Sequence, residues 1–246
     1  VTIRRMNLKN RIVMPPMYVG VGLRGRRARA YYVERARGGV GTITIAATYV
    51  DAFALDEAWD RVGAVEEFLL SVRPLIEAVH QAGAKIGVQL VHMNKLPLGL
   101  SPEDTRGEPI APSSRKESDP PLVLLHPGES MRALTIPEIE FIVSKFATAA
   151  RNVKRSGFDF VEFHSAHGYL PCQFLSPLLN RRSDRYGGDL RRRARFGIEC
   201  ISAIREAVGD FPIFVRLGVE ERVSGGLTLT EGAEIAMAFE KAGVDV

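Results

Sequence analysis

Cysteine is scarce in this chain, since only Cys172 and Cys200 occur among its 246 residues. Two cysteines do not indicate a disulfide framework, so we expect a reducing compartment, the cytoplasm. Long apolar runs are also missing, and the short, interrupted ones that occur exclude a membrane-spanning helix. No basic, apolar and small-residue pattern opens the chain, so we expect no secretion signal. The net charge of +4 suits an anionic cofactor or substrate and does not require nucleic acid.

Apolar strand patterns alternate with helical patterns along the chain, which predicts a parallel sheet without antiparallel hairpins. No G-x-G-x-x-G follows a strand, so the usual dinucleotide fingerprint is absent and a (β/α)8 TIM barrel is favoured. Such a barrel needs roughly 250 residues. The pattern here reaches only a sixth strand, so we predict one barrel domain over 1–246, C-terminally truncated. The expected strands are 11–17, 40–47, 85–91, 158–165, 212–218 and the start of one at 244–246, and the expected helices are 30–37, 68–82, 136–156, 190–208 and 230–242.

One segment interrupts the alternation. Residues 96–136 follow the third expected strand and hold seven of the fourteen prolines. A loop of this length is usually functional or disordered. In a barrel it would overhang the carboxyl ends of the strands, where active sites lie, so we predict a capping insertion.

Polar side chains stand at or just beyond the ends of the expected strands. In a parallel barrel these ends share one mouth, so we expect the side chains to converge there. Glu162 should point the same way as His164, because side chains alternate along a strand. The polar set consists of Gln89, His92, His164, His167, Tyr169 and Arg216.

The His164-x-x-His167 pair is open to three interpretations. With a third histidine it could bind zinc or copper, but cysteine ligands are absent and the carboxylate is weakly placed. It could also be a pair of satisfied loop histidines. The third interpretation is a carbonyl clamp, in which two imidazole N–H groups donate to one oxygen that gains charge. A neighbouring tyrosine, Tyr169, could then protonate a basic, enolate-like carbon.

Gln89 and Arg216 extend the third interpretation. A glutamine amide suits an imide edge, and a guanidinium suits a group that becomes anionic on reduction. A flavin has both features at its pyrimidine end.

Five stretches resemble the Old Yellow Enzyme family of NADH:flavin oxidoreductases, nearest to the branch of 2,4-dienoyl-CoA reductases, 2-enoate reductases and bile-acid-type oxidoreductases. The motif H-x-A-H-G-Y-L…F-L-S-P…N-x-R-x-D-x-Y-G-G is specific to it. The resemblance implies an FMN-containing (β/α)8 barrel that reduces activated C=C bonds of α,β-unsaturated carbonyl compounds with NADH or NADPH. The stretches are LKNRIVMPPM (8–17), YYVERARGGVGTI (31–43), AGAKIGVQLVH (82–92), 158–196 and VRLGVEERVSGGLTL (215–229).

The resemblance also implies a role for each matching residue. His164 and His167 would bind the substrate carbonyl oxygen, and Tyr169 would protonate the carbon beside it. The residues implied to contact FMN are Pro15, Pro16, Met17, Tyr18, Ala47, Gln89 and Arg216. Many relatives have Cys or Thr where this chain has Tyr18, and the family's phosphate-holding loops after the seventh and eighth strands lie outside the sequence. Larger relatives add a 4Fe-4S cluster and FAD in a C-terminal extension.

Other functions stay open beside the ene-reductase. The barrel could bind a ligand without turnover, or the histidines could serve a zinc hydrolase. Arginine clusters at 23–30 and 190–195 lack the stacking aromatics of a nucleic-acid module, so we expect a solvated face instead. The expected partner is a small molecule, and self-association is left open.

Overall fold

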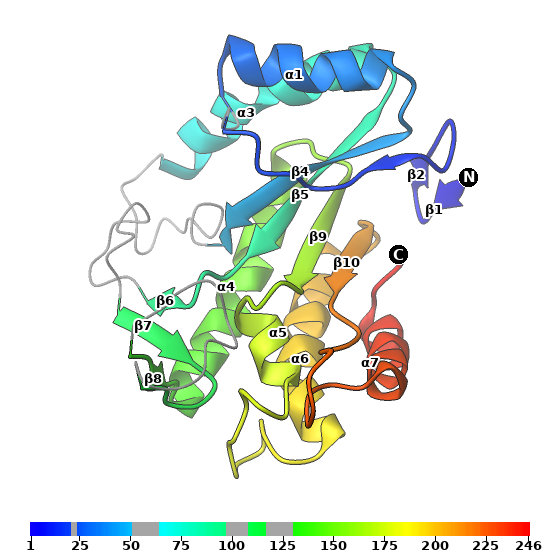
Figure 1. The fold of residues 1–246 in the computed structure, drawn as a ribbon. Coiled ribbons are helices and arrows are strands. Elements are labelled where there is room, and N and C mark those ends of the chain that lie inside the picture. Colours follow the sequence, from blue (N-terminus) through cyan, green and yellow to red (C-terminus); the bar gives the residue numbers. More distant parts are fainter. Residues whose placement is uncertain (21–23, 51–63, 97–107, 117–129) are drawn as a thin grey trace.

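The computed structural model describes residues 1–20, 24–50, 64–96, 108–116 and 130–246. Its main sheet has five parallel strands in the order β10-β9-β5-β4-β3, so neighbours in space follow one another along the chain (Figure 1). A doubly wound sheet would reverse this order, whereas a barrel keeps it. The strands are β3 (Val13–Met14), β4 (Thr42–Tyr49), β5 (Lys85–Val91), β9 (Phe160–Ser165) and β10 (Ile213–Leu217).

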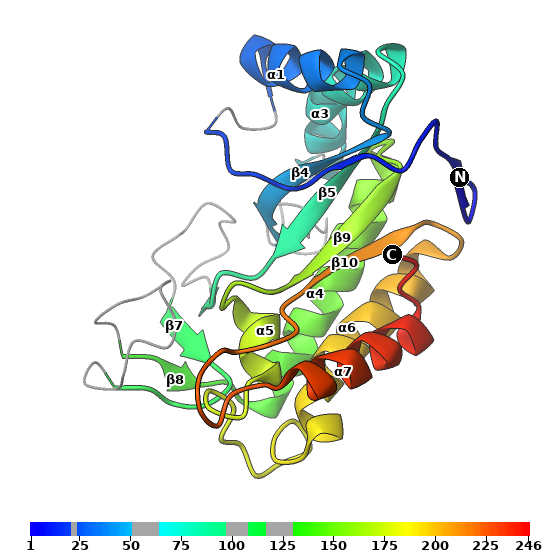
Figure 2. The same ribbon diagram turned by 45° about the vertical axis from the view of Figure 1, so that its right-hand side comes forward.

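Helices connect these strands and cover one face of the sheet (Figures 1 and 2). They are α1 (Arg26–Arg37), α3 (Ala64–Gln81), α4 (Ile136–Arg155), α6 (Leu190–Val208) and α7 (Leu229–Ala242). After α7 the backbone runs beside β10, where Asp245 N donates to Ile213 O at 2.8 Å and Val215 N donates to Val246 O at 2.9 Å. The chain thus forms the first five strands of a (β/α)8 barrel and the start of the sixth, as predicted.

The alternation of side chains along β9 separates the two faces of the sheet. Val161 and Phe163 point outward into the large core beneath the helices. Phe160 points inward, where its ring stacks on Phe214 at 4.3 Å between centroids. Gly87 on β5 makes room for this stack, because a Cβ there would lie 2.5 Å from the Phe160 ring.

The amino end of the barrel interior is closed by an N-terminal hairpin of β1 (Thr2–Ile3) and β2 (Met6–Asn7). Met6 and Leu8 pack against the stacked phenylalanines in a second buried cluster. Burial of such a side chain contributes about 1.5–3 kcal/mol. This apolar plug leaves the opposite, carboxyl end of the strands for polar groups.

The hairpin corrects the expectation that antiparallel pairs are absent. A second antiparallel pair joins β6 (Lys95–Leu96) to β7 (Glu108–Ala111), and β8 (Arg132–Ala133) completes a small three-stranded sheet. β6 and β8 lie at the two ends of the predicted insertion 96–136 and β7 lies within it. Most of the insertion lies outside the described residues, so its role as a cap stays a prediction.

Several predicted boundaries were wrong for physical reasons. The first strand covers two residues instead of 11–17, because Pro15 and Pro16 have no N–H to donate to a neighbouring strand. Helix α1 begins four residues earlier than expected, at Arg26, since exposed arginines are good helix formers although they break the apolar pattern. Helix α4 begins at a capping box, with Thr135 and Glu138 bonded reciprocally.

The RRSDRYGG segment (181–188) and the preceding Asn180 order the turn that precedes α6. Asn180 Nδ2 donates to the carbonyls of Phe174 and Tyr186, both at 2.7 Å. Arg182 binds Asp184 and also the Pro112 carbonyl beyond β7. The segment therefore joins the small sheet to the barrel.

No helix in the described ranges is long and apolar enough to cross a membrane.

Candidate active site

A row of polar side chains lines the inner face of the sheet toward its carboxyl end. The strand register places Gln89 of β5 opposite Glu162 of β9, and His164 of β9 opposite Arg216 of β10. Gln89, Glu162 and His164 are almost completely buried, whereas Arg216 is exposed. The structure thus brings together three predicted residues from three separate strands. His92 lies just beyond β5 and is buried, and its carbonyl accepts from Leu170 N.

The chain turns sharply where β9 ends, and this turn presents the predicted catalytic side chains. Tyr169 N donates to Ala166 O at 3.2 Å. His167 adopts a left-handed backbone with φ 57°, which histidine tolerates better than most residues and which is frequent at functional sites. Short helix α5 (Leu170–Leu175) begins directly afterwards, with Tyr169 at its N-cap.

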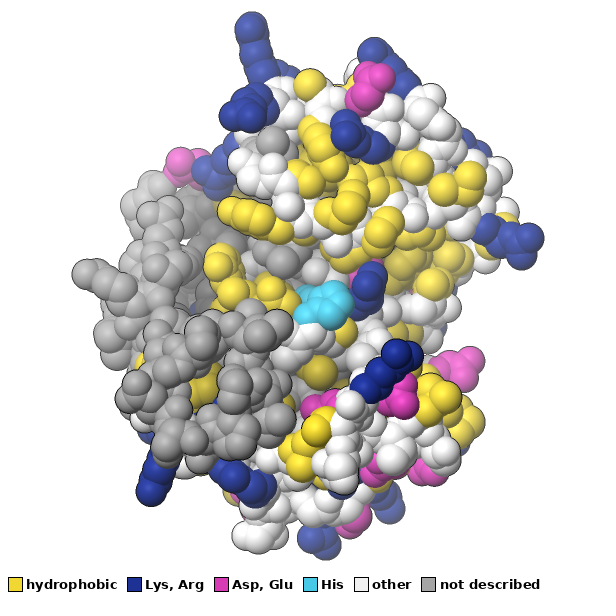
Figure 3. Space-filling view, in the orientation of Figure 1, with side chains coloured by type: hydrophobic (Ala, Val, Ile, Leu, Met, Phe, Trp, Pro, Cys, Tyr) yellow, Lys and Arg dark blue, Asp and Glu magenta, His cyan; other side chains and the backbone are white. Residues whose placement is uncertain are grey.

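The turn gathers three aromatic rings. The His164 ring lies 5.0 Å from the His167 ring and 4.8 Å from the Tyr169 ring, between centroids. His164 is buried, Tyr169 half-buried and His167 exposed. In the space-filling view, a histidine surface patch is visible with a Lys or Arg side chain beside it (Figure 3). The exposure of the rings therefore increases from His164 in the barrel interior, through Tyr169, to His167 at the surface.

Both histidines are held in the neutral form. Burial lowers the pKa of His164 to about 3, and the charges of His167 and Arg216 act in the same direction. The pKa of His167 is lowered by burial and by Arg216. A neutral imidazole carries one N–H donor and one acceptor nitrogen. The buried His164 Nδ1 has no hydrogen-bond partner within the described part of the chain.

Tyr169 and Glu162 are both shifted toward their protonated forms. Burial, and then the neighbouring Tyr49 phenol, raise the pKa of Tyr169, so its hydroxyl keeps its proton at neutral pH. Burial also raises the pKa of Glu162, while the hydrogen bond from Gln89 and the charge of Arg216 favour its carboxylate.

The remaining predicted residues lie on β3 and β4 or just after them. Met17 and Tyr18 are 46% and 89% exposed, so two large apolar surfaces are open to a ligand. Pro15 is exposed and Pro16 is half-buried. Ala47 sits in β4 beside an irregularity of the β4–β5 register, and its side chain lies outside the described residues.

Two features of this site, one residue and one hydrogen bond, were not predicted from the sequence. One is Tyr49, whose phenol acts on Tyr169 and which lies at the end of β4, two residues beyond the expected strand. The other is the hydrogen bond from Gln89 Nε2 to Glu162 Oε1, at 2.7 Å. The signal for this pair was present, because both residues lie on the inward-facing positions of strands that proved to be neighbours.

Comparison with known proteins assigns the family. The model of the NADH:flavin oxidoreductase / NADH oxidase family matches residues 1–246. The chain belongs to this family. The NADH oxidase of Thermoanaerobacter brockii is 42% identical over 254 residues, which cover 97% of this chain and 36% of that protein. The NADPH dehydrogenase of Geobacillus sp. (strain WCH70) is 37% identical over 250 residues, 100% of this chain and 69% of the relative.

A solved structure agrees with the family assignment. An Old Yellow Enzyme homologue from Zymomonas mobilis superimposes with a TM-score of 0.76 at 25% identity, covering 100% of this chain and 70% of that one. The predicted resemblance to the Old Yellow Enzyme family is therefore confirmed. The chain spans about a third of the length of the Thermoanaerobacter oxidase and about 70% of the other two proteins.

The inner face of the sheet fits the flavin that gives this family its name. Met17 and Tyr18 offer apolar surface for a ring system, and Gln89 offers an amide for an imide edge. Arg216 supplies an exposed positive charge, and His164 has a buried ring nitrogen that still needs a partner. These four features lie on or just beyond strands β3, β5, β9 and β10 of one parallel sheet, so the residues present fit the cofactor.

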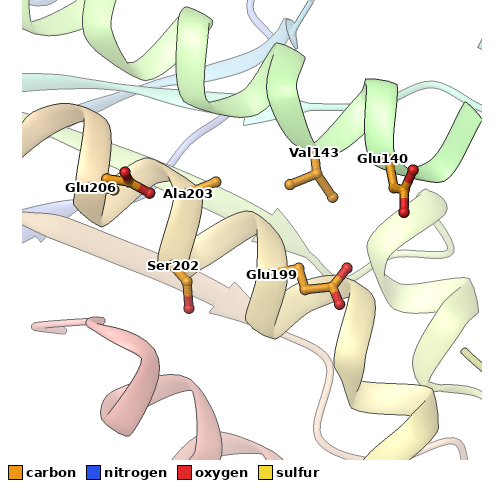
Figure 4. A pocket seen from close by; sticks show the side chains of 6 residues that line it. All are labelled: Glu140, Val143, Glu199, Ser202, Ala203 and Glu206. Carbon is orange, nitrogen blue, oxygen red and sulfur yellow. The ribbon is translucent and has the colours of Figure 1, made fainter. Parts of the chain in front are cut away.

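A metal site and a surface groove are the alternatives to this active site. The described residues contain no group of three or more His, Cys, Asp or Glu side chains that could hold a metal ion. A shallow groove of about 340 Å³ lies between α4 and α6, on the outer, helical layer (Figure 4). It is lined by Glu140, Val143, Glu199, Ser202, Ala203 and Glu206.

Proposed function

We propose that the chain is the FMN-binding barrel of an oxidoreductase that reduces activated C=C bonds of α,β-unsaturated carbonyl compounds at the expense of NADH or NADPH. The observation that carries the proposal is the group of two neutral imidazoles and a protonated phenol, in which the His167 and Tyr169 rings lie 5.0 Å and 4.8 Å from the His164 ring between centroids. Family membership and the names of the relatives, NADH oxidase and NADPH dehydrogenase, support the cofactor and the reductant.

His164 and His167 bind the carbonyl oxygen of the substrate in this proposal. Each neutral ring donates one N–H, and the two donors share an oxygen on which negative charge develops. Donors that are fixed before the reaction stabilise this charge without reorganising. Burial and Arg216 keep the rings neutral, so the clamp works through N–H dipoles and leaves the protons on the imidazoles.

Tyr169 supplies the proton. Its raised pKa keeps the hydroxyl protonated, and only a strongly basic acceptor such as an enolate carbon can take the proton. The tilted contact with His164 holds the phenol beside the oxygen clamp. The proton therefore goes to the carbon next to the carbonyl, at the position where the clamp has stabilised the enolate.

Seven residues would hold the cofactor in this proposal. Pro15, Pro16, Met17 and Tyr18 would lie along the flavin ring, and Ala47 would contact it from β4. Gln89 would face the pyrimidine edge, and Arg216 would lie near the N1 and C2 carbonyl region. Bound FMN would supply the hydride chemistry that links NAD(P)H to the β-carbon of the alkene. A 4Fe-4S cluster and FAD elsewhere in the full-length protein stay a prediction.

The decisive experiment separates the two half-reactions of the full-length protein by stopped-flow absorbance. Tyr169→Phe should slow reoxidation of the flavin by an enone roughly 100-fold, the scale of general acid catalysis. Flavin reduction by NAD(P)H should stay within about twofold of wild type, because it needs no proton from Tyr169. The neighbouring phenol gives a matched control, and Tyr49→Phe should leave both steps within a few-fold.

Two outcomes would contradict the proposal. Equal loss of both half-reactions in Tyr169→Phe would assign the residue a structural role. A full-length protein that purifies colourless and takes up no FMN on reconstitution would remove the oxidoreductase function altogether.

A further inference from the structure

The proposed mechanism does not use Glu162, a buried acidic residue beside the site. Glu162 is 6% exposed, on the inner face of β9, between the apolar plug below and His164 above. Its Oε1 accepts a hydrogen bond of 2.7 Å from Nε2 of Gln89, which is itself 3% exposed. A buried carboxylate is costly to keep without a function, so this pair needs an explanation.

The chemistry of the pair fixes the orientation of the glutamine amide. The oxygen and nitrogen of such an amide are nearly alike in shape, so only its partners decide which atom points where. A carboxylate only accepts hydrogen bonds. In the ionised form, which the hydrogen bond from Gln89 and the charge of Arg216 favour, Glu162 is therefore bound by the NH2 branch of Gln89, as the 2.7 Å contact shows. The reversed amide would bring three acceptor oxygens together and leave them unsatisfied, which disfavours it roughly 5- to 150-fold.

The register of the strands makes this orientation relevant to the cofactor. Gln89 and Glu162 are direct neighbours across the β5–β9 ladder, and the next inward position on β9 is His164. Arg216 lies opposite His164 on the following strand. Glu162 thus contacts Gln89, the residue proposed to face the flavin. On β9, Glu162 lies one inward-facing position deeper in the barrel than His164.

We propose that Glu162 is a positioning residue that holds the Gln89 amide with its carbonyl oxygen toward the imide N–H of the flavin. This inference rests on the proposed FMN-binding function. The imide N–H is the one donor of the pyrimidine edge, between two carbonyl acceptors, so an unanchored amide could equally well turn its NH2 group to a carbonyl. The Glu162 carboxylate fixes the orientation of the Gln89 amide before FMN binds. An amide that is already oriented binds the cofactor more tightly.

A double-mutant cycle on the full-length protein tests the inference, with the dissociation constant of FMN measured by fluorescence titration of the apoprotein. Glu162→Met should weaken FMN binding about tenfold. Gln89→Met should weaken it at least as much. Adding Glu162→Met to Gln89→Met should change the constant less than twofold, because Glu162 acts through Gln89. An apolar side chain of similar volume is usually tolerated in place of a buried charge.

A conservative variant gives a graded result. Glu162→Gln can both accept from and donate to Gln89, so either orientation of the Gln89 amide finds a partner and FMN binding should fall only about two- to threefold, less than in Glu162→Met. Glu206→Gln, which removes a carboxylate from the outer groove of Figure 4, is the matched control and should leave FMN affinity unchanged.

A spectroscopic readout reports the hydrogen bond directly. With 15N-labelled FMN, the imide proton should move upfield in Glu162→Met, because its acceptor is no longer held in place, and should move less in Glu162→Gln. The inference is overturned by any of three results: an unchanged affinity in Glu162→Met, a full effect of that change in the Gln89→Met background, or a Glu162→Gln variant as weak as Glu162→Met. Failure of the wild type to bind FMN would instead refute the proposed function.

Discussion

The neutral state of His164 predicts a pH-dependent loss of stability that can be measured without substrate. Its pKa lies at about 3 in the folded protein and near 6.5 in an unfolded chain. Between these values the unfolded state binds the proton and the folded state does not, so stability falls as the pH falls. The contribution is complete above about pH 6.5 and decreases as the pH approaches 3. One pKa unit corresponds to about 1.36 kcal/mol, so the loss between pH 8 and pH 5 is about 2 kcal/mol.

His164→Asn isolates this contribution, because asparagine does not titrate. We expect the free energy of unfolding of the wild type, minus that of the variant, to fall by about 2 kcal/mol from pH 8 to pH 5. Urea unfolding of the full-length protein, followed by circular dichroism at constant ionic strength, measures the difference. His167→Asn should show the same direction, since its pKa is also lowered.

Nuclear magnetic resonance provides an independent check on the same residue. The Cε1 proton of His164 should not titrate between pH 8 and pH 5. A resonance of His164 that titrates near pH 6.5, or a stability difference that stays constant over this range, would show that the imidazole is not shielded by burial and by Arg216. The clamp would then carry a positive charge, and the proposed donation by neutral N–H groups would be wrong.

Three further results are expected. His164→Ala combined with His167→Ala should weaken binding of a phenolate ligand, a mimic of the enolate, tenfold or more, since hydrogen bonds to charged groups contribute about 1.5–3 kcal/mol; unchanged affinity by flavin difference spectroscopy would favour two loop histidines. Gly87→Ala should destabilise the fold by about 1–3 kcal/mol through overpacking against Phe160, measured as a lower urea midpoint. Thr135→Ala should cost about 1 kcal/mol in the same assay, because it removes the capping box of α4.

The order of strands and helices could be predicted from the sequence because both signals are local. Apolar runs such as 85–91 give the strands, and helices such as 190–208 follow from their period and flanking glycine. The two hairpins could not be predicted, because each strand is only two to four residues long and pairs through backbone groups that leave no side-chain pattern. Helix α5 was missed for a similar reason, since six residues contain too few turns to show a period.

The residues that form the site could be predicted from the sequence, but their protonation states could not. The strand ends predicted that His164 and Arg216 share one mouth of the barrel, and the structure adds that they lie opposite each other in the β9–β10 register. The pKa values depend on burial, which the sequence does not report for a histidine at a strand end. The partnership of Gln89 and Glu162 likewise required knowledge of which strands are adjacent and how they are aligned.

Arg216 connects these observations. Its charge acts against protonation of both histidines and in favour of the Glu162 carboxylate, so one guanidinium biases three titratable groups of the inner row. If the histidines were charged, they would attract a carbonyl oxygen strongly before the reaction as well as during it, and such uniform binding does not accelerate the chemical step. Neutral donors gain most as the oxygen becomes negative. The positive charge at this mouth therefore sits on Arg216, beside the proposed cofactor, while the substrate-facing donors remain dipoles.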